Sequence, residues 1–212
     1  MLTKNINFKN FKSKKKNDKV RNNLKVILNE NNEILKSLSS SYKNSYNKKI
    51  ILKFKKYSNI KVIGMGGSIL GTETIYNFLN HKIKKNFYFH NNLQSKIKYL
   101  DKKKYVNLVV SKSGNTLETI ANANIIIKKR DKNIFITENR KSYLYLLAKE
   151  LKAQIVHHNN FIGGRYSVLS EVGMLPAELM GLNVSKFRQL NNLIKNKNFI
   201  NALITNVNNT LF

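Results

Sequence analysis

The stretch Ser111-Lys112-Ser113-Gly114-Asn115-Thr116-Leu117-Glu118-Thr119 joins two contrasting patterns. It follows an apolar run typical of a β-strand, Val106 to Val110, and opens a helix-like segment from Thr116 to about Lys129. A turn between a strand and a helix favours anion binding, because the first-turn N–H groups are unpaired and the helix dipole is positive there. The stretch therefore predicts an anion-binding turn.

The residue types in this turn point to phosphate. Ser111, Ser113 and Thr116 supply hydroxyl donors, Lys112 supplies positive charge, and Gly114 lets the backbone approach a ligand closely. The residues alone leave an alternative open. In that alternative the turn is an ordinary strand-to-helix connection, and Thr116 simply caps the helix.

Strand-like and helix-like segments alternate from residue 59 onward. The strands are expected at 59–63, 86–90, 106–110, 133–137 and 154–157, and the helices at 69–79, 93–100, 116–129 and 143–151. This alternation is typical of parallel strands joined by right-handed crossovers. It predicts the α/β class, a three-layer α/β/α sandwich with a five-stranded parallel sheet in the order 2-1-3-4-5. That order brings the ends of the first and third strands together, where such folds bind ligands.

The regions on either side of the sheet are predicted to be helical. A solvated arm at 1–16 precedes helices expected at 17–39 and about 46–56, and four more follow the sheet at 169–175, 176–180, 185–196 and 199–212. Pro176 would start the second of these four. The chain thus divides into a basic N-terminal arm with helices (1–57), a domain that carries the site (58–185) and trailing helices (186–212).

A second motif, Gly64-Met65-Gly66-Gly67-Ser68, follows the first strand. It is not a dinucleotide fingerprint, because Ile69 stands where the last glycine is needed and the second strand ends in Phe89-His90 without an acid. It is not a P-loop either, since no Gly-Lys-Ser/Thr follows. The motif predicts either a backbone that approaches a small polar ligand, with Ser68 as a donor, or a tight turn that lets the helix pack closely on the strand.

The third motif, Gly163-Gly164-Arg165-Tyr166-Ser167, follows the fifth strand. Arg165 offers a planar, permanently charged fork that suits an oxyanion. A Gly-Gly-Arg turn alone is weak evidence for a binding site, because a surface arginine is usually just solvated. Three such motifs at the carboxyl ends of strands 1, 3 and 5 together predict a site for a small anionic ligand.

Composition excludes several classes of protein. The 212 residues include no cysteine, four histidines and 11 acidic residues without close metal-ligand spacing, so neither disulfides nor a metal site is expected. No apolar run suits a signal peptide or a membrane span, which predicts a cytoplasmic protein without membrane partners. The net charge is +28, but the lysines are scattered along the chain. Lys, Asn, Ile, Phe and Tyr are all abundant and are encoded by A- and T-rich codons, so biased base composition explains the charge and no specific nucleic-acid partner is expected.

In order and spacing, the three motifs resemble those of glucose-6-phosphate isomerases, the phosphoglucose isomerase family. The matching segments are 64–68, 111–119 and 163–170, continued by Glu171-Val172-Gly173-Met174-Leu175-Pro176-Ala177. The resemblance runs from about residue 58 to 185 and marks this range as a sugar-isomerase (SIS) domain. It implies interconversion of glucose 6-phosphate and fructose 6-phosphate through a cis-enediol intermediate, without a metal or organic cofactor.

The resemblance also implies roles for single residues. Ser111, Ser113 and Thr116 would donate to the 6-phosphate of the hexose, and Lys112 would contribute through its backbone and charge. On the sugar side, the residues implied are Gly67, Ser68, Gly164 and Arg165. Arg165 would stabilise the charge of the enediolate, which is commonly the largest catalytic effect.

Glu118 is a further candidate. It is expected to face the same site and to orient Arg165 or Lys112, or else to be an ordinary first-turn glutamate favoured by the helix dipole.

Other catalytic groups implied by the family are missing from this chain. The proton-shuttling Glu, the ring-opening His and a Lys near the ring oxygen would lie on a second domain beyond Phe212. Glu171 and Glu178 match no family base, and we interpret His157 and His158 as structural.

The chain is therefore expected to be a fragment or truncated product of a longer isomerase, inactive alone and homodimeric at full length. The alternative is a non-catalytic SIS module that binds sugar phosphates.

Overall fold

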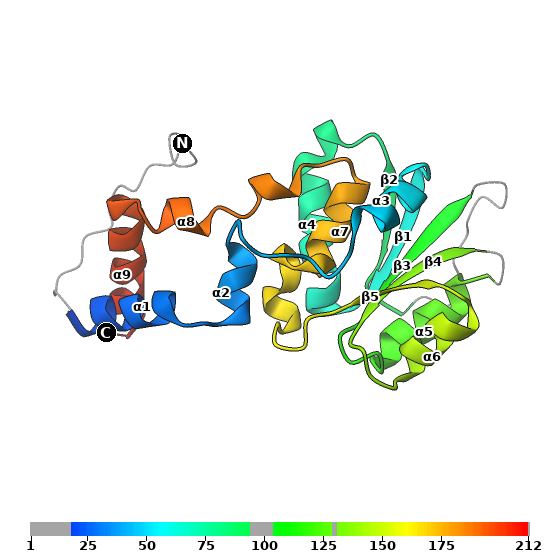
Figure 1. Cartoon of the computed structure of the whole chain (residues 1–212), viewed down its shortest axis with the longest axis horizontal. Helices are drawn as coiled ribbons and strands as arrows, with labels where there is room; N and C mark the ends of the chain where they lie inside the picture. The colour runs from blue at the N-terminus through cyan, green and yellow to red at the C-terminus, as the bar shows by residue number, and fades with distance from the viewer. Residues whose placement is uncertain (1–17, 94–103, 129–130, 212) are drawn as a thin grey trace. The chain divides into compact units, whose positions relative to one another are not determined.

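The computed structural model describes residues 18–93, 104–128 and 131–211, which include a parallel sheet of five strands. The strands are β1 (Asn59–Gly64), β2 (Asn86–His90), β3 (Tyr105–Val110), β4 (Lys132–Thr137) and β5 (Gln154–His157). Their order is β2-β1-β3-β4-β5, and every neighbouring pair is parallel (Figure 1). The predicted fold class and strand order are confirmed.

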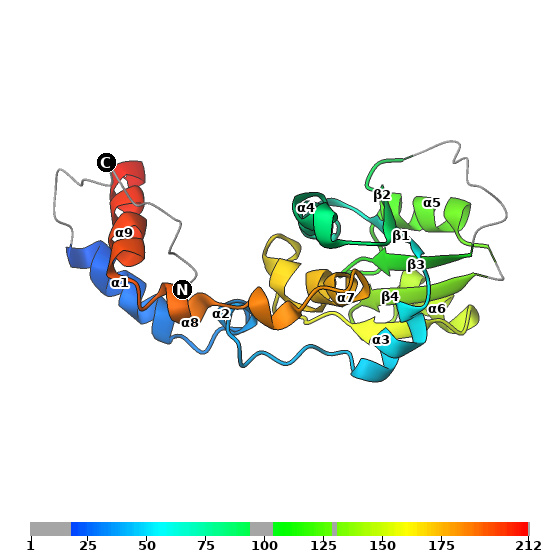
Figure 2. The same cartoon turned by 90° about the horizontal axis from the view of Figure 1, so that it is seen from above.

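Helices cover both faces of the sheet and give the fold its three layers. One face carries α5 (Leu117–Ile126) and α6 (Tyr143–Glu150), and the other carries α4 (Leu70–Leu79) and α7 (Glu171–Leu179) (Figure 1, Figure 2). The chain moves across the sheet in one direction from β1 to β2 and in the other from β3 to β5. Right-handed crossovers therefore place α4 opposite α5 and α6. α3 (Lys48–Lys55) packs against α7.

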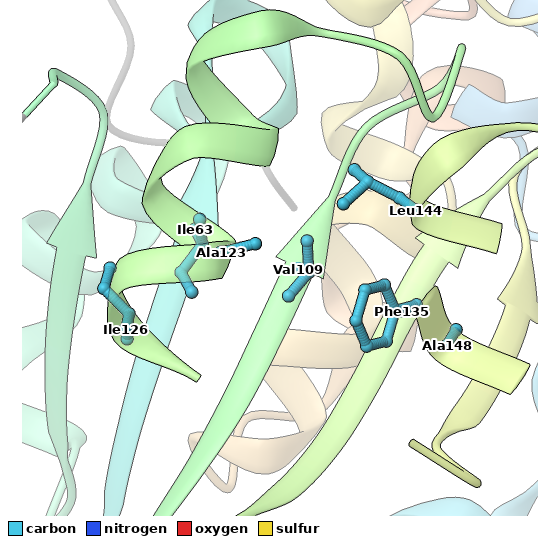
Figure 3. Close-up of a cluster of buried hydrophobic side chains, with 7 residues drawn as sticks. All are labelled: Ile63, Val109, Ala123, Ile126, Phe135, Leu144 and Ala148. Carbon is cyan, nitrogen blue, oxygen red and sulfur yellow. The ribbon is translucent and has the colours of Figure 1, made fainter. Parts of the chain in front are cut away.

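One cluster of the hydrophobic core lies where apolar strand positions meet α5 and α6. Its buried members are Ile63, Val109, Ala123, Ile126, Phe135, Leu144 and Ala148 (Figure 3). β3 is buried at every position, as expected for a central strand that is covered on both faces. The turn that follows β3 therefore starts from a rigid support.

The end of α5 differs from the expectation. We expected the helix to reach about Lys129, but it ends at Ile126, and Ile127 is already extended with φ −77° and ψ 123°. The run of three β-branched residues at 125–127 favours this change, because branching at Cβ lowers helix propensity and suits extended backbone. Residue 129 itself lies outside the described residues.

The prediction that Pro176 starts a new helix is wrong. Pro176 lies inside α7, although a proline lacks the N–H that would bond the carbonyl four residues earlier. That carbonyl, of Val172, instead accepts a hydrogen bond from the buried Thr72 hydroxyl of α4 at 3.3 Å. A donor from a neighbouring helix thus replaces the missing one, and sequence spacing gives no sign of it.

By compactness the chain falls into two units. One is Lys43–Val184, with the sheet; the other combines the described residues up to Tyr42 with those from Ser185 onward. The helices of the second unit are α1 (Asp18–Asn29), α2 (Glu33–Leu38), α8 (Leu190–Leu193) and α9 (Lys197–Leu211), and α1 packs against α9.

The helix expected at 185–196 is interrupted. A 3₁₀ turn, η4 (Val184–Lys186), and the short α8 replace it. Between them Arg188 is buried, donates to the Tyr42 carbonyl at 3.2 Å and lies 4.9 Å from the centre of the Tyr42 ring. This tertiary contact explains why the local helical pattern does not hold.

Some expectations fall on residues that the structure does not describe. These are the arm at 1–16 and all but the first residue of the helix at 93–100. The boundaries 1–57, 58–185 and 186–212 stay predictions. Within the described ranges, no helix combines the length and apolar character that crossing a membrane requires.

Candidate functional site

The three motifs lie at one edge of the sheet, because the carboxyl ends of parallel strands share an edge. Gly64 at the end of β1 pairs with Val110 at the end of β3, so the two connections begin side by side. They then run to α4 and α5 on opposite faces of the sheet. This is the switch point at which open α/β sheets bind ligands.

The turn after β3 gathers three hydroxyl groups. The buried Ser111 Oγ lies 3.0 Å from Thr116 Oγ1, and Ser113 Oγ lies 3.5 Å from the same atom. The amide N–H of Gly114 donates to Ser111 Oγ at 3.2 Å, and that of Asn115 donates to Ser113 Oγ at 3.2 Å. The hydroxyls thus form a cluster whose shape is fixed by the backbone of the turn.

Thr116 occupies the N-cap position of α5 but does not cap it with its side chain. Its backbone is extended, with φ −66° and ψ 117°, and its hydroxyl accepts no hydrogen bond from the first-turn amides. The simple capping role that the sequence left open is therefore not adopted. Among the described residues, no side chain caps the first-turn N–H groups of α5, which therefore stay able to bind an anion.

Gly114 is required by the shape of this turn. Its φ is +66°, and a Cβ atom there would lie 2.1 Å from Ser142 Oγ and 2.9 Å from Thr137 Oγ1. Its carbonyl accepts the amide N–H of Leu144 in the first turn of α6 at 3.0 Å. The turn is therefore packed directly onto the start of α6, which leaves it little freedom to move.

The glycine motif after β1 lies against the arginine motif after β5. A Cβ atom on Gly67 would lie 2.3 Å from the carbonyl of Gly164 and 2.8 Å from the amide of Arg165. Ser167 Oγ ties the two loops, donating to the Gly164 carbonyl at 2.7 Å and reaching the Gly67 carbonyl at 3.4 Å. Two of the predicted site segments are thus in direct backbone contact.

Arg165 lies in a 3₁₀ segment, η3 (Gly164–Leu169), and its side chain is exposed. Within the described part of the chain, its guanidinium takes part in no hydrogen bond or ion pair. The guanidinium is therefore available to an anion. Ser68 is half-buried in the preceding 3₁₀ turn, and no hydrogen bond among the described residues links it to the hydroxyl cluster.

Lys112 is engaged with the protein itself. Its Nζ donates to the Asn160 carbonyl at 2.6 Å and lies 3.7 Å from Glu138 Oε1. The second carboxylate oxygen of Glu138 accepts from Arg140 Nε at 2.9 Å. Glu118, half-buried in the first turn of α5, forms no ion pair with Lys112 or Arg165 among the described residues.

Glu138 and Glu171 are two buried acids near the site to which the motifs assign no role. Glu138 is 7% exposed and comes directly after β4, at the same edge of the sheet as the three motifs. Its position after a strand could therefore have predicted that it lies near the site. Glu171 is fully buried at the start of α7 and accepts the amide N–H of Asn159 at 2.7 Å.

The two histidines at the end of β5 differ in their surroundings. His157 is exposed, whereas His158 is fully buried and its Nδ1 lies 3.0 Å from the Asn159 carbonyl oxygen. Burial lowers the pKa of His158, and the Asn159 carbonyl and the nearby Glu171 act in the opposite direction.

Comparison with known proteins places these motifs in a family. The model of the family described as phosphoglucose isomerase matches residues 14–207. A glucose-6-phosphate isomerase of Methanocaldococcus jannaschii is 33% identical over 174 residues, covering 74% of this chain and 43% of the relative. Another, of Acholeplasma laidlawii, is 40% identical over 147 residues, covering 60% of this chain and 34% of the relative. The chain thus spans less than half the length of these curated relatives.

The fold has solved counterparts. A hypothetical protein of Thermus thermophilus superposes with a TM-score of 0.67 at 20% identity, covering 89% of this chain and 50% of that one. At this identity the similarity concerns the fold alone.

Proposed function

The chain belongs to the phosphoglucose isomerase family, and from this premise we propose that it forms the sugar-phosphate-binding part of an isomerase. The full-length protein would interconvert glucose 6-phosphate and fructose 6-phosphate through a cis-enediol intermediate. The observation that carries the proposal is the uncapped start of α5, where three hydroxyls meet free first-turn amides.

In this proposal the turn after β3 binds the 6-phosphate. Ser111, Ser113 and Thr116 donate their hydroxyl protons to phosphate oxygens, together with backbone amides and the positive end of the α5 dipole. Lys112 adds positive charge close by. Because the turn is fixed by β3 and by the packing of Gly114 onto α6, the cluster is preorganised and loses little freedom on binding.

Arg165 acts at the other end of the sugar. The exposed guanidinium would stabilise the negative charge that develops on the sugar oxygens as a proton moves between C1 and C2. Gly67, Ser68 and Gly164 line the sugar between these two ends, and the glycines allow the two loops to lie in contact.

The proton transfer itself needs groups from elsewhere. Of the described acids near the motifs, Glu138 is paired with Arg140 and Lys112, Glu171 is fully buried, and the half-buried Glu118 lies in the first turn of α5, beside the hydroxyls proposed to bind the phosphate. We propose that the base lies in the part of the relatives' length that this chain does not span. Homodimerisation of the full-length protein and a cytoplasmic location also stay proposals.

Binding of glucose 6-phosphate to the purified chain tests the phosphate site. The chain should melt at a higher temperature as ligand is added, and Thr116→Val should weaken binding by about 10- to 150-fold, because one charge-assisted hydrogen bond is worth roughly 1.5–3 kcal/mol. Thr210→Val, which removes an exposed hydroxyl from α9, is the matched control and should bind like the wild type. No change in melting temperature at millimolar ligand would refute the phosphate site.

An isomerisation assay separates the two candidate functions. The 212-residue chain is expected to bind without turnover, and the full-length protein should lose about 10²–10³-fold in kcat with Arg165→Ala. A specific observation favours the alternative of a non-catalytic sensor, namely that Glu138 is paired with Lys112 and Arg140 and that Glu171 is fully buried. Binding by a full-length protein that shows no turnover would establish that alternative.

A further inference from the structure

Lys112 connects two loops that the proposed function uses separately. It lies in the phosphate-binding turn, one residue after Ser111, and its Nζ donates to the Asn160 carbonyl at 2.6 Å. Asn160 belongs to the connection that leads from β5 into Gly163, Gly164 and Arg165. The Lys112 side chain thus reaches across the end of β4, which lies between β3 and β5 in the sheet.

Glu138 holds the ammonium group in this position. Its Oε1 lies 3.7 Å from Lys112 Nζ, and its side chain is 9% exposed, against 31% for Lys112. Arg140 Nε donates to the second carboxylate oxygen at 2.9 Å, which fixes the carboxylate orientation. A carboxylate that is largely removed from water attracts the ammonium more strongly than an exposed one would.

The backbone at the end of β4 supports both loops. The Lys112 carbonyl accepts the amide N–H of Glu138 at 3.1 Å and is 3.4 Å from the Thr137 hydroxyl. The Thr137 carbonyl in turn accepts the amide N–H of His158 at 2.9 Å. Since both loops are anchored to Thr137, one at its hydroxyl and the other at its carbonyl, a small number of contacts sets the distance between them.

The connection after β5 is also held from its other side. Glu171, fully buried at the start of α7, accepts the amide N–H of Asn159 at 2.7 Å. Asn159 and Asn160 are therefore fixed between a carboxylate and an ammonium group. Movement of this connection would carry Gly163 to Arg165 with it.

We propose that Lys112, oriented by Glu138, is a positioning residue that sets the distance between the phosphate-binding turn and Arg165. We call the contacts among Lys112, Glu138 and Asn160 the clasp. The inference rests on the proposed function and changes the part that Lys112 plays in it. The ammonium group binds protein atoms, so it acts on the sugar through the placement of Arg165.

Two ligands distinguish positioning from direct contact. A 5-phosphorylated five-carbon aldonic acid carries a phosphate and, at its other end, a carboxylate that imitates the enediolate. The corresponding five-carbon sugar alcohol 5-phosphate lacks the carboxylate. The acid needs both the turn and Arg165, whereas the alcohol needs the turn alone, so only binding of the acid depends on the distance between them.

Calorimetric titration of the 212-residue chain and its variants gives the readout. Lys112→Met should weaken binding of the acid by about tenfold or more and change binding of the alcohol by less than about twofold. In an Arg165→Ala background, Lys112→Met should cause no further loss, because the group that it places is gone. Lys141→Met removes an exposed positive charge from the loop after β4 and should leave both affinities unchanged.

Two conservative variants test the geometry of the clasp. Glu138→Gln keeps the shape of the side chain but removes its charge, and it should lower the affinity for the acid while sparing the alcohol. Lys112→Arg can still donate to the Asn160 carbonyl and should restore most of the affinity for the acid. A merely structural role would weaken both ligands together.

Other results would overturn the clasp. Equal losses of acid and alcohol with Lys112→Met would mean that the ammonium binds the phosphate or only supports the fold, and a full loss in the Arg165→Ala background would mean that it touches the sugar. In both cases the proposed function would stand. If the wild type binds neither ligand, the proposed function and the clasp fail together.

Discussion

At position 67 the protein has no room for a methyl group. A Cβ atom there would lie 2.3 Å from carbonyl atoms of Gly164, and backbone cannot move aside as a flexible side chain can. We expect Gly67→Ala to separate the two loops, to lower the free energy of unfolding by about 1–3 kcal/mol and to displace Arg165. Binding of the phosphorylated aldonic acid should weaken by roughly tenfold or more, measured by titration.

A neighbouring glycine provides the control for this substitution. A Cβ atom on Gly163 would meet only Tyr166 Cδ2, at the ordinary contact distance of 3.7 Å. Gly163→Ala should therefore bind the acid like the wild type. If both variants behave alike, the contact between Gly67 and Gly164 has no special role in placing Arg165.

His158 gives the protein a pH-dependent stability. Burial, the first cause, lowers its pKa in the folded state below the ordinary value of 6.5, and the Asn159 carbonyl, Glu171 and Glu138 oppose this while Lys112 adds to it. As the pH falls through about 6.5, the unfolded chain takes up a proton that the folded chain does not. The free energy of unfolding should therefore decrease as the pH falls from 7 toward the lowered pKa.

Urea unfolding at pH 7, 6 and 5 would measure this dependence. His158→Gln should flatten the decrease between pH 7 and 5, because the residue that takes up the proton is gone. His157→Gln, which removes an exposed imidazole from the same segment, is the control. An unchanged slope in His158→Gln would show that other groups cause the acid sensitivity.

At the scale of elements, α7 depends on a donor from α4. The Val172 carbonyl lacks its helical partner because residue 176 is proline, and the Thr72 hydroxyl replaces that partner at 3.3 Å. Thr72→Val keeps the side-chain shape but leaves a buried carbonyl unpaired, so we expect it to lower the free energy of unfolding by about 1–3 kcal/mol. Chemical denaturation of the variant would measure this loss.

A double-mutant cycle distinguishes this effect from simple loss of packing. In a Pro176→Ala background the residue 176 amide can bond the Val172 carbonyl, so Thr72→Val should cost much less there. An equal cost in both backgrounds would mean that the hydroxyl does not replace the helical bond.

The elements differ in how far the sequence could predict them. The strands at 86–90 and 154–157 were placed at their observed bounds, because a short apolar run between turn residues is a local signal. The predicted end of α5 is wrong because the backbone becomes extended at Ile127. The predicted helix start at Pro176 is wrong because a hydroxyl from α4 supplies the hydrogen bond that the proline cannot make. Contacts between distant segments, unlike local patterns, leave little trace in spacing.

The same distinction applies to the candidate site. Ser111, Ser113 and Thr116 lie within six residues, so one turn was enough to predict their grouping. The contact of Lys112 with Asn160 spans 48 residues and requires the order of β3, β4 and β5. The ligand roles of these residues stay predictions.

At the scale of the whole molecule, the chain has a net charge of +28 and only 11 acidic residues, so the places where it buries an acid are informative. Among the described residues, the buried acids are Glu138 and Glu171, and both lie at the edge of the sheet that carries the three motifs. Burying a carboxylate is unfavourable unless it is paired or hydrogen-bonded. Glu138 is paired with Lys112 and Arg140, and Glu171 accepts the Asn159 amide N–H. The same contacts that offset the burial of these carboxylates therefore hold the loops of the site in place.

The unit Lys43–Val184 should carry the binding function by itself. It contains the sheet, the core around Phe135 and every residue from Gly67 to Arg165 that we propose to contact the sugar phosphate. We expect residues 43–184, produced alone, to unfold cooperatively and to bind glucose 6-phosphate within about twofold of the affinity of the whole chain. At a ligand concentration of 100 Kd, binding should add about 2.7 kcal/mol to the free energy of unfolding in both proteins. A folded unit that fails to bind would mean that the residues up to Tyr42 or from Ser185 onward contribute to the site.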